Sequence, residues 1–155
     1  MPNRRSFLAV AAGGLLPMSR ELGAQVQIAP RRIGFLTVFT RADSEVILGL
    51  LRTELEKLGW TDGRNIALEF RTTEGRNDRL PSVAAEVVAQ APDLILVQSL
   101  PATRALMQAT TTIPIVMIGV GNPVELGIVA DFQKPGGNVT GSSVLANEIA
   151  GKLLQ

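Results

Sequence analysis

A nearly unbroken apolar run, residues 113–118 (IPIVMI), leads directly into a loop of glycine and asparagine, residues 119–122 (GVGN). Such a run is typical of a strand buried on both faces, which occurs mainly in parallel sheets that carry helices on each side. Open α/β sheets bind ligands at the carboxyl ends of their strands. The run therefore predicts an α/β fold in which this loop lies at a candidate binding site.

Further elements alternate along the chain in the same way. Apolar and β-branched side chains predict strands over residues 32–38, 66–70, 93–97, 113–118 and 139–145. Apolar residues at helical spacing predict helices over residues 40–58, 78–88, 101–109 and, as a short one, 123–130. Strands that alternate with helices through short loops imply a mostly parallel, doubly wound sheet with right-handed crossovers.

Local signals mark where the predicted helices begin and end. Thr40 and Asp43 fit an N-terminal capping pair for the first helix, and Gly59 is expected to end it. The apolar positions at helical spacing in this helix are Val46, Ile47, Leu50, Leu51, Leu55 and Leu58. Asn77 or Asp78 is expected to cap the second helix, with a proline tolerated in its first turn.

Composition excludes several classes of function. The 155 residues are 46% apolar and 19% charged, which is typical of one folded domain. The absence of cysteine and histidine excludes thiol nucleophiles, disulfides and zinc sites of the usual kind. A net charge of +1 without a large Lys/Arg cluster gives no indication of a nucleic-acid groove. No catalytic set is recognisable, so we expect a protein that is not an enzyme and needs no metal or cofactor.

The first 24 residues are interpreted as an export signal. Arg4 and Arg5 precede an apolar segment, residues 7–18, which is shorter than the roughly 20 residues needed to span a bilayer. A twin-arginine signal and an ordinary secretory signal both remain open. Residues 25–31 would form a linker, and the mature protein would be periplasmic and not itself membrane-spanning.

Three predicted strand exits place polar groups at helix N-termini, which attract polar and anionic ligand groups. They are residues 37–40 (TVFT), 98–103 (QSLPAT) and 119–123 (GVGNP). The candidate ligand-binding residues are Thr37, Phe39, Thr40, Ser99, Ala102, Thr103, Gly119 and Asn122. For Thr40 and Ser99 the alternative is helix capping alone, for Gly119 a tight turn, and for Phe39 packing in the core.

Several motifs, taken together, resemble a known family. They are IGFL at residues 33–36, LGWTDGRNI at 58–66, EGRNDRLP at 74–81, TIPIV at 112–116, NPVELG at 122–127 and KPGGNVTG at 134–141. Their order and spacing are similar to those of the substrate-binding proteins of ABC importers, tryptophan/tyrosine type. That family shares the type I periplasmic-binding-protein fold.

The resemblance implies a bilobed protein that closes on a small polar solute, an amino acid or similar carboxylate, and delivers it to an ABC permease. Residues 32–146 would be its N-terminal lobe, and residues 147–155 the start of a crossover helix to a second lobe that this chain lacks. The family often has Asp where this chain has Asn122. Because one lobe leaves a ligand half exposed, we expect this chain alone to bind weakly or not at all.

Two other interpretations stay open at this point. The first is that the chain is a non-functional gene fragment of such a protein. The second is that it is a nucleotide- or flavin-binding α/β enzyme domain. The enzyme interpretation is disfavoured because residues 119–123 lack the third glycine of a dinucleotide fingerprint and no P-loop Lys-Ser/Thr is present.

Overall fold

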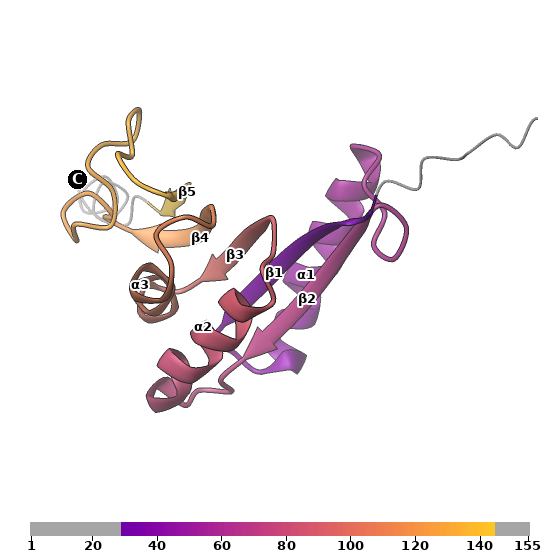
Figure 1. Cartoon of the computed structure of the whole chain (residues 1–155), viewed down its shortest axis with the longest axis horizontal. Helices are drawn as coiled ribbons and strands as arrows, with labels where there is room; N and C mark the ends of the chain where they lie inside the picture. Colours follow the sequence, from indigo (N-terminus) through magenta and orange to yellow (C-terminus); the bar gives the residue numbers. More distant parts are fainter. Residues whose placement is uncertain (1–28, 145–155) are drawn as a thin grey trace, which may run out of the picture.

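A computed structural model of the chain describes residues 29–144. Within them a five-stranded sheet has the order β2-β1-β3-β4-β5, and every neighbouring pair of strands is parallel. The strands are β1 (Arg31–Thr37), β2 (Ile66–Thr72), β3 (Leu94–Gln98), β4 (Ile115–Gly121) and β5 (Val139–Val144). The helices are α1 (Arg41–Lys57), α2 (Leu80–Ala89) and α3 (Leu100–Ala109), with a 3-10 turn, η1 (Asn77–Arg79), before α2. The predicted parallel α/β fold is confirmed (Figure 1).

The helices cover the two faces of the sheet unequally, with α2 and α3 on one side and α1 on the other (Figure 1). The larger core lies beneath α2 and α3 and includes Leu36, Val87, Val97, Leu106 and Met117. A smaller core lies beneath α1 and contains Phe35, Leu48 and Phe70. We call these sides the α2–α3 face and the α1 face. Helices on both faces confirm the doubly wound arrangement.

The ends of α1 follow from the expected signals. Oγ1 of Thr40 accepts a hydrogen bond from the backbone N–H of Asp43 at 3.1 Å, and Gly59 takes a positive φ of 85° just beyond the helix. The spacing of apolar residues did not identify correctly which side of α1 is buried. Leu48 is fully buried, whereas Val46 and Leu50 are 72% and 56% exposed.

Two helix predictions are wrong. Residues 123–130 form turns rather than a helix, because the carbonyl of Pro123 accepts from the N–H of Ile128 at 2.8 Å and Gly127 takes a φ of 66°. Neither Asn77 nor Asp78 caps α2, because both lie in η1, and α2 begins after Arg79 without a side-chain cap.

The KPGGNVTG motif holds β4 and β5 together. The side-chain amide of Asn138 donates to the carbonyl of Ile113 at 2.8 Å, just before β4 begins. Farther along, β4 advances three residues between Met117 and Val120 while β5 advances two, so β4 carries a bulge with one extra residue. The motif therefore has a structural role at this edge of the sheet.

Several predictions lie outside the described residues. These are the export signal, linker residues 25–28, residue 145 of the last predicted strand and the crossover helix over residues 147–155. Across residues 29–144, no helix has the length and apolar character needed to cross a membrane.

Candidate functional site

The ends of β1 and β3 are joined by a polar contact. Thr37 and Gln98 are register partners, and the Thr37 hydroxyl donates to Oε1 of Gln98 at 3.5 Å. The same hydroxyl oxygen accepts the N–H of Phe39 at 3.2 Å, which shapes the turn that leaves β1. Because Thr37 is fully buried, it organises the carboxyl edge from beneath.

Phe39 and Thr40 occupy the β1–α1 turn. Phe39 is 46% exposed and lines a pocket of about 330 Å³ together with Asp43 and Gln98, so its ring is available to a ligand. The Thr40 hydroxyl accepts the N–H of Asp43 and donates to its carboxylate at 2.7 Å. Thr40 is therefore fully engaged as a helix cap, and Phe39 is the group that this turn offers outward.

The β3–α3 turn is dominated by Ser99. Its backbone takes a φ of 97°, and its hydroxyl oxygen accepts the N–H of Ala102 at 3.4 Å. Its carbonyl oxygen accepts the Thr103 hydroxyl at 2.8 Å. Ala102 and Thr103 are 0% exposed, so in this structure their side chains belong to the core and Ser99 is the surface group of the turn.

The β4 exit differs from the expected one. β4 continues to Gly121, so Gly119 lies within the strand, at the bulge, where its N–H donates to Oγ of Ser142 at 3.3 Å. Asn122 follows the true strand end with a φ of 44°, and its side-chain amide donates to Glu125 at 3.0 Å. Asn122 therefore lies at the carboxyl edge, and it is followed by the turns of residues 123–130 rather than by a helix.

The strand order brings the three exits together. β1, β3 and β4 are consecutive neighbours, and all three run parallel, so Phe39, Ser99 and Asn122 follow strands that end at the same edge. Of the eight candidate residues, four combine a place at the edge with a side chain that is not fully buried, namely Phe39, Thr40, Ser99 and Asn122. Thr40 and Ser99 both cap the helices that follow them, and Gly119 contributes only backbone.

A fourth exit escaped the sequence analysis. The Thr72 hydroxyl at the end of β2 donates to the carbonyl of Phe39, and the N–H of Thr73 donates to the carbonyl of Thr37 at 3.2 Å. Oγ1 of Thr73 is buried and has no hydrogen-bond partner among the described residues. The available signal was the consecutive pair of threonines after a strand, which the sequence analysis ended too early, at residue 70.

The two helix N-termini at this edge differ in charge. α1 carries Asp43 in its first turn, whereas α3 has no acidic residue in its first turn. The positive end of the α3 macrodipole is therefore uncompensated next to Ser99, and a carboxylate stands at the start of α1. An edge of this kind suits a ligand that has separate negative and positive groups.

The opposite, amino-terminal edge holds the larger pocket, of about 520 Å³, lined among others by Trp60 and Asp93. The pKa of Asp93 is lowered from its usual value, first by a hydrogen bond from the N–H of Arg32 and then by one from the Arg31 side chain. These partners hold Asp93 in an exposed structural ion pair. Residues 29–144 contain no group of three potential metal-ligating side chains at either edge.

A sequence profile described as "ABC transporter substrate binding protein" matches residues 38–152, which include all three strand exits after Thr37. This chain belongs to that family. The resemblance inferred from the sequence motifs is thereby confirmed.

Several known proteins are similar to this chain over part of their length. The tyrosine-binding protein of Clostridioides difficile (strain R20291) is 42% identical over 89 residues, which is 57% of this chain and 26% of that protein. A ligand-free, open substrate-binding protein with adhesive properties from Clostridium difficile is 32% identical, with a TM-score of 0.67 over 73% of this chain and 38% of its own.

Two further solved structures share the fold. The ABC domain of a Streptococcus pneumonia protein in complex with L-Trp is 29% identical, with a TM-score of 0.67 over 74% of this chain and 39% of its own. A conserved domain protein from Vibrio cholerae is 28% identical, with a TM-score of 0.72 over 80% of this chain and 42% of its own. The chain thus spans about a quarter of the curated relative and about two fifths of the solved ones.

Proposed function

We propose that this chain is the N-terminal lobe of the solute-binding component of an ABC importer, and that it binds an aromatic amino acid at the carboxyl edge of its sheet. The observation that carries the proposal is the convergence of three polar exits, those of β1, β3 and β4, at one edge. The choice of solute is supported by a tyrosine-binding relative and by the solved domain that holds L-Trp.

The charges at the edge favour one orientation of such a solute. The carboxylate would lie at the N-terminus of α3, near Ser99, where the macrodipole is uncompensated. The ammonium would face Asp43, which lines the same pocket as Phe39 and Gln98. The solute ring would then stack on the half-exposed ring of Phe39. Oγ1 of Thr73 lies beneath the same turn but is buried, so the solute does not reach it in this conformation.

The proposed role is binding rather than catalysis. The relatives are substrate-binding proteins, and the edge presents capping hydroxyls and backbone turns rather than a nucleophile paired with a base. The partner would be an ABC permease, and the working compartment would be the periplasm, reached through the signal in residues 1–24 by the twin-arginine or the general secretory route. A gene fragment without transport activity is the competing proposal.

Nuclear magnetic resonance of the full chain with L-tryptophan tests the proposed function. At an expected Kd of about 1 mM, roughly −4 kcal/mol, a titration to about 10 mM reaches most of the binding. We expect shifts confined to the amides of Phe39, Ser99 and Asn122 and their neighbours. Tryptamine lacks the carboxylate and indole-3-propionate lacks the ammonium, so both should bind more weakly. Shifts elsewhere only, or equal affinity for all three compounds, would contradict the proposal.

A further inference from the structure

Gln98 is the last residue of β3, and its side chain lies on the α1 face of the sheet. In the same strand Ile95 and Val97 are buried in the larger core of the α2–α3 face, whereas Leu96 packs against the smaller core of the α1 face. Because side chains alternate along a strand, Gln98 shares the side of Leu96. The apolar row that β3 places on the α1 face therefore ends, at the carboxyl edge, in an amide.

The two neighbouring strands also end in polar residues at this level. Thr37 of β1 is the register partner of Gln98 on one side and of Thr72 on the other. The Thr37 hydroxyl accepts the N–H of Phe39. The Thr72 hydroxyl donates to the carbonyl of Phe39 and accepts the N–H of Glu74. Both threonine hydroxyls are thus used to hold turns of the protein, which leaves the amide of Gln98 as the group of this row that can serve a ligand.

The protein itself engages Gln98 only weakly. Oε1 of Gln98 accepts the Thr37 hydroxyl at 3.5 Å, which is long for a hydrogen bond of this kind. Since the hydroxyl proton needs an acceptor, Oε1 rather than Nε2 is the atom nearer to Thr37. Within residues 29–144, no group accepts a hydrogen bond from Nε2, and Gln98 lines the same pocket as Phe39 and Asp43. Its two N–H donors are therefore available to a solute in that pocket.

The adjacent N-terminus of α3 has few backbone donors left for a carboxylate. Pro101 has no N–H. The N–H of Ala102 donates to the hydroxyl of Ser99 at 3.4 Å, and the N–H of Thr103 donates to the Ser99 carbonyl at 3.1 Å. In this first turn only the N–H of Leu100 lacks a partner among the described residues. A carboxylate has two acceptor oxygens, so a further donor is needed beside this helix end.

We propose that Gln98 recognises the carboxylate of the solute by donating a hydrogen bond from Nε2 within the pocket of Phe39 and Asp43. The role assigned to Gln98 rests on the proposed function and adds a specificity-determining contact to it. The amide of Gln98 attracts an anionic group, and the carboxylate of Asp43 attracts a cationic one. Together they select a solute that carries both a carboxylate and an ammonium over an amine that carries the ammonium alone.

Gln98→Glu separates this role from a structural one. The new side chain has the same length and still accepts the Thr37 hydroxyl, so the fold should be kept, as thermal unfolding will check. It has no N–H to donate, and its charge repels an anionic group. In the magnetic resonance titration we expect the Kd for L-tryptophan to rise at least about fivefold, as for the loss of a charge-assisted hydrogen bond. The Kd for tryptamine, which has no carboxylate, should stay the same or fall.

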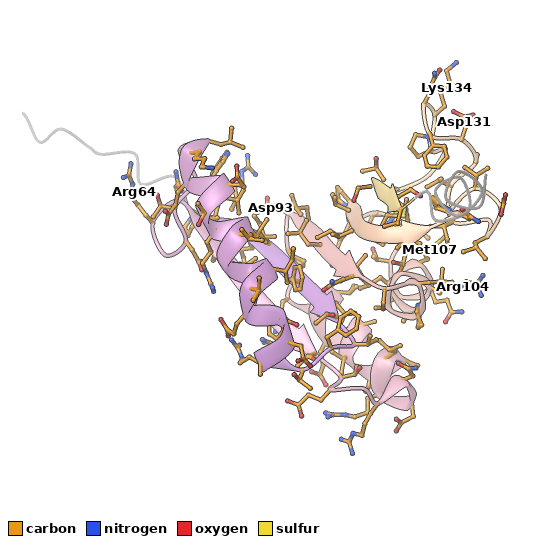
Figure 2. The ribbon with its side chains drawn as sticks, turned by 180° about the vertical axis from the view of Figure 1, so that it is seen from behind. Arg64, Asp93, Arg104, Met107, Asp131 and Lys134 are labelled. Atoms are coloured by element: carbon orange, nitrogen blue, oxygen red, sulfur yellow. The ribbon has the colours of Figure 1, made fainter. Side chains whose placement is uncertain are left out.

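Gln108→Glu is the matched control, because it makes the same change of side chain and net charge at an exposed position of α3. Gln108 follows Met107, which Figure 2 shows on α3, and this helix lies on the other face of the sheet from α1 (Figure 1). The control should bind both compounds as the unsubstituted chain does. Net charge alone would affect the two variants equally.

The side-chain amide of Gln98 gives an independent readout. Its two Nε2 protons are identified as the signals that disappear from the spectrum of Gln98→Met, a variant that keeps the length of the side chain and adds no charge. On titration of the unsubstituted chain, these signals should move with L-tryptophan and move much less with tryptamine. Gln98→Met should also lose affinity for L-tryptophan, which makes the result independent of the charge in Gln98→Glu.

Two results would overturn the role of Gln98 and leave the proposed function in place. One is a Kd for L-tryptophan that Gln98→Glu does not change. The other is an equal loss of affinity for L-tryptophan and tryptamine, which would show that Gln98 shapes the pocket without contacting the carboxylate. If L-tryptophan shifts none of the amides of Phe39, Ser99 and Asn122 in the unsubstituted chain, the proposed function fails, and the role of Gln98 fails with it.

Discussion

Gly141 on β5 lies directly against the backbone of Met117 on β4, so that a Cβ at position 141 would be 2.0 Å from the Met117 carbonyl oxygen. The φ of Gly141 is 139°, a region that side chains other than glycine rarely adopt. The last glycine of KPGGNVTG is therefore required by the close approach of two strands beside the bulge.

Gly141→Ala should accordingly be strongly destabilising. The clash is with backbone atoms and the φ is unfavourable, so we expect a loss of about 2–4 kcal/mol in the free energy of unfolding, measured by urea denaturation. Gly137→Ala in the same motif is the control, because nothing lies within 4 Å of its built Cβ. Equal effects of the two substitutions would show that the close approach to Met117 is not the reason for glycine at position 141.

Thr40→Ala separates capping from solute binding at the β1–α1 turn. The Thr40 hydroxyl accepts the N–H of Asp43, so its removal should cost about 1 kcal/mol of unfolding free energy, while Thr40→Ser should cost much less. Chemical denaturation of both variants measures this difference. A stable Thr40→Ala variant that loses its response to L-tryptophan would assign this hydroxyl to the solute instead.

Phe39→Ala should weaken solute binding and leave the fold intact. Phe39 is 46% exposed at the carboxyl edge, so its ring has little core packing to lose, whereas stacking on an aromatic ligand contributes about 0.5–1.5 kcal/mol. We expect a 2- to 12-fold rise in Kd for L-tryptophan in the magnetic resonance titration. Phe132→Ala serves as control, and a matching loss in that variant would argue against a specific contact.

Asp93→Asn should reduce stability in a way that depends on pH. Contacts from Arg32 and Arg31 lower the folded-state pKa of Asp93 below its usual value of 3.8. The charge of Asp93 therefore contributes fully to the free energy of unfolding at pH values above the unfolded-state pKa. This contribution is lost as the pH falls through the lower, folded-state pKa. Unfolding midpoints of the two proteins should differ at neutral pH and converge as the pH falls through the lowered pKa of Asp93. A constant difference would mean that the charge of Asp93 is not involved.

Much of the fold could be predicted because parallel strands have a distinct sequence pattern. The run at residues 113–118 and the alternation of apolar segments identified each of the strands found in residues 29–144, although β4 proved to extend to Gly121. The region 46–51 is apolar or small at every position, and periodicity alone does not say which side of such a helix faces a sheet. Leu48 is the buried member, decided by packing on Phe35.

The candidate site was predictable in place but not in detail. Parallel topology brings the strand exits to one edge, which the sequence pattern already implied. Which side chains remain available to a ligand depends on the local backbone. At the β3–α3 turn, Ser99 takes a φ of 97° and its carbonyl accepts the hydroxyl of the buried Thr103. In β4, the bulge places Gly119 within the strand rather than in the loop after it. Thr73 was missed because the predicted strand ended at residue 70, whereas β2 continues to Thr72.

The extra residue in β4 reverses the parity of the strand. Met117 and Val120 are three positions apart, yet both pack into the α2–α3 face, where regular alternation would send them to opposite sides. A regular strand of the same length, without the bulge, would exchange the sides of Val120 and of the residues that follow, up to Asn122, whereas deleting Gly119 would place Val120 two positions after Met117 and keep its side. The number of residues in β4 therefore determines the orientation of this loop as much as their chemistry does. An alignment gap misplaced by one position would assign the wrong residues to the edge.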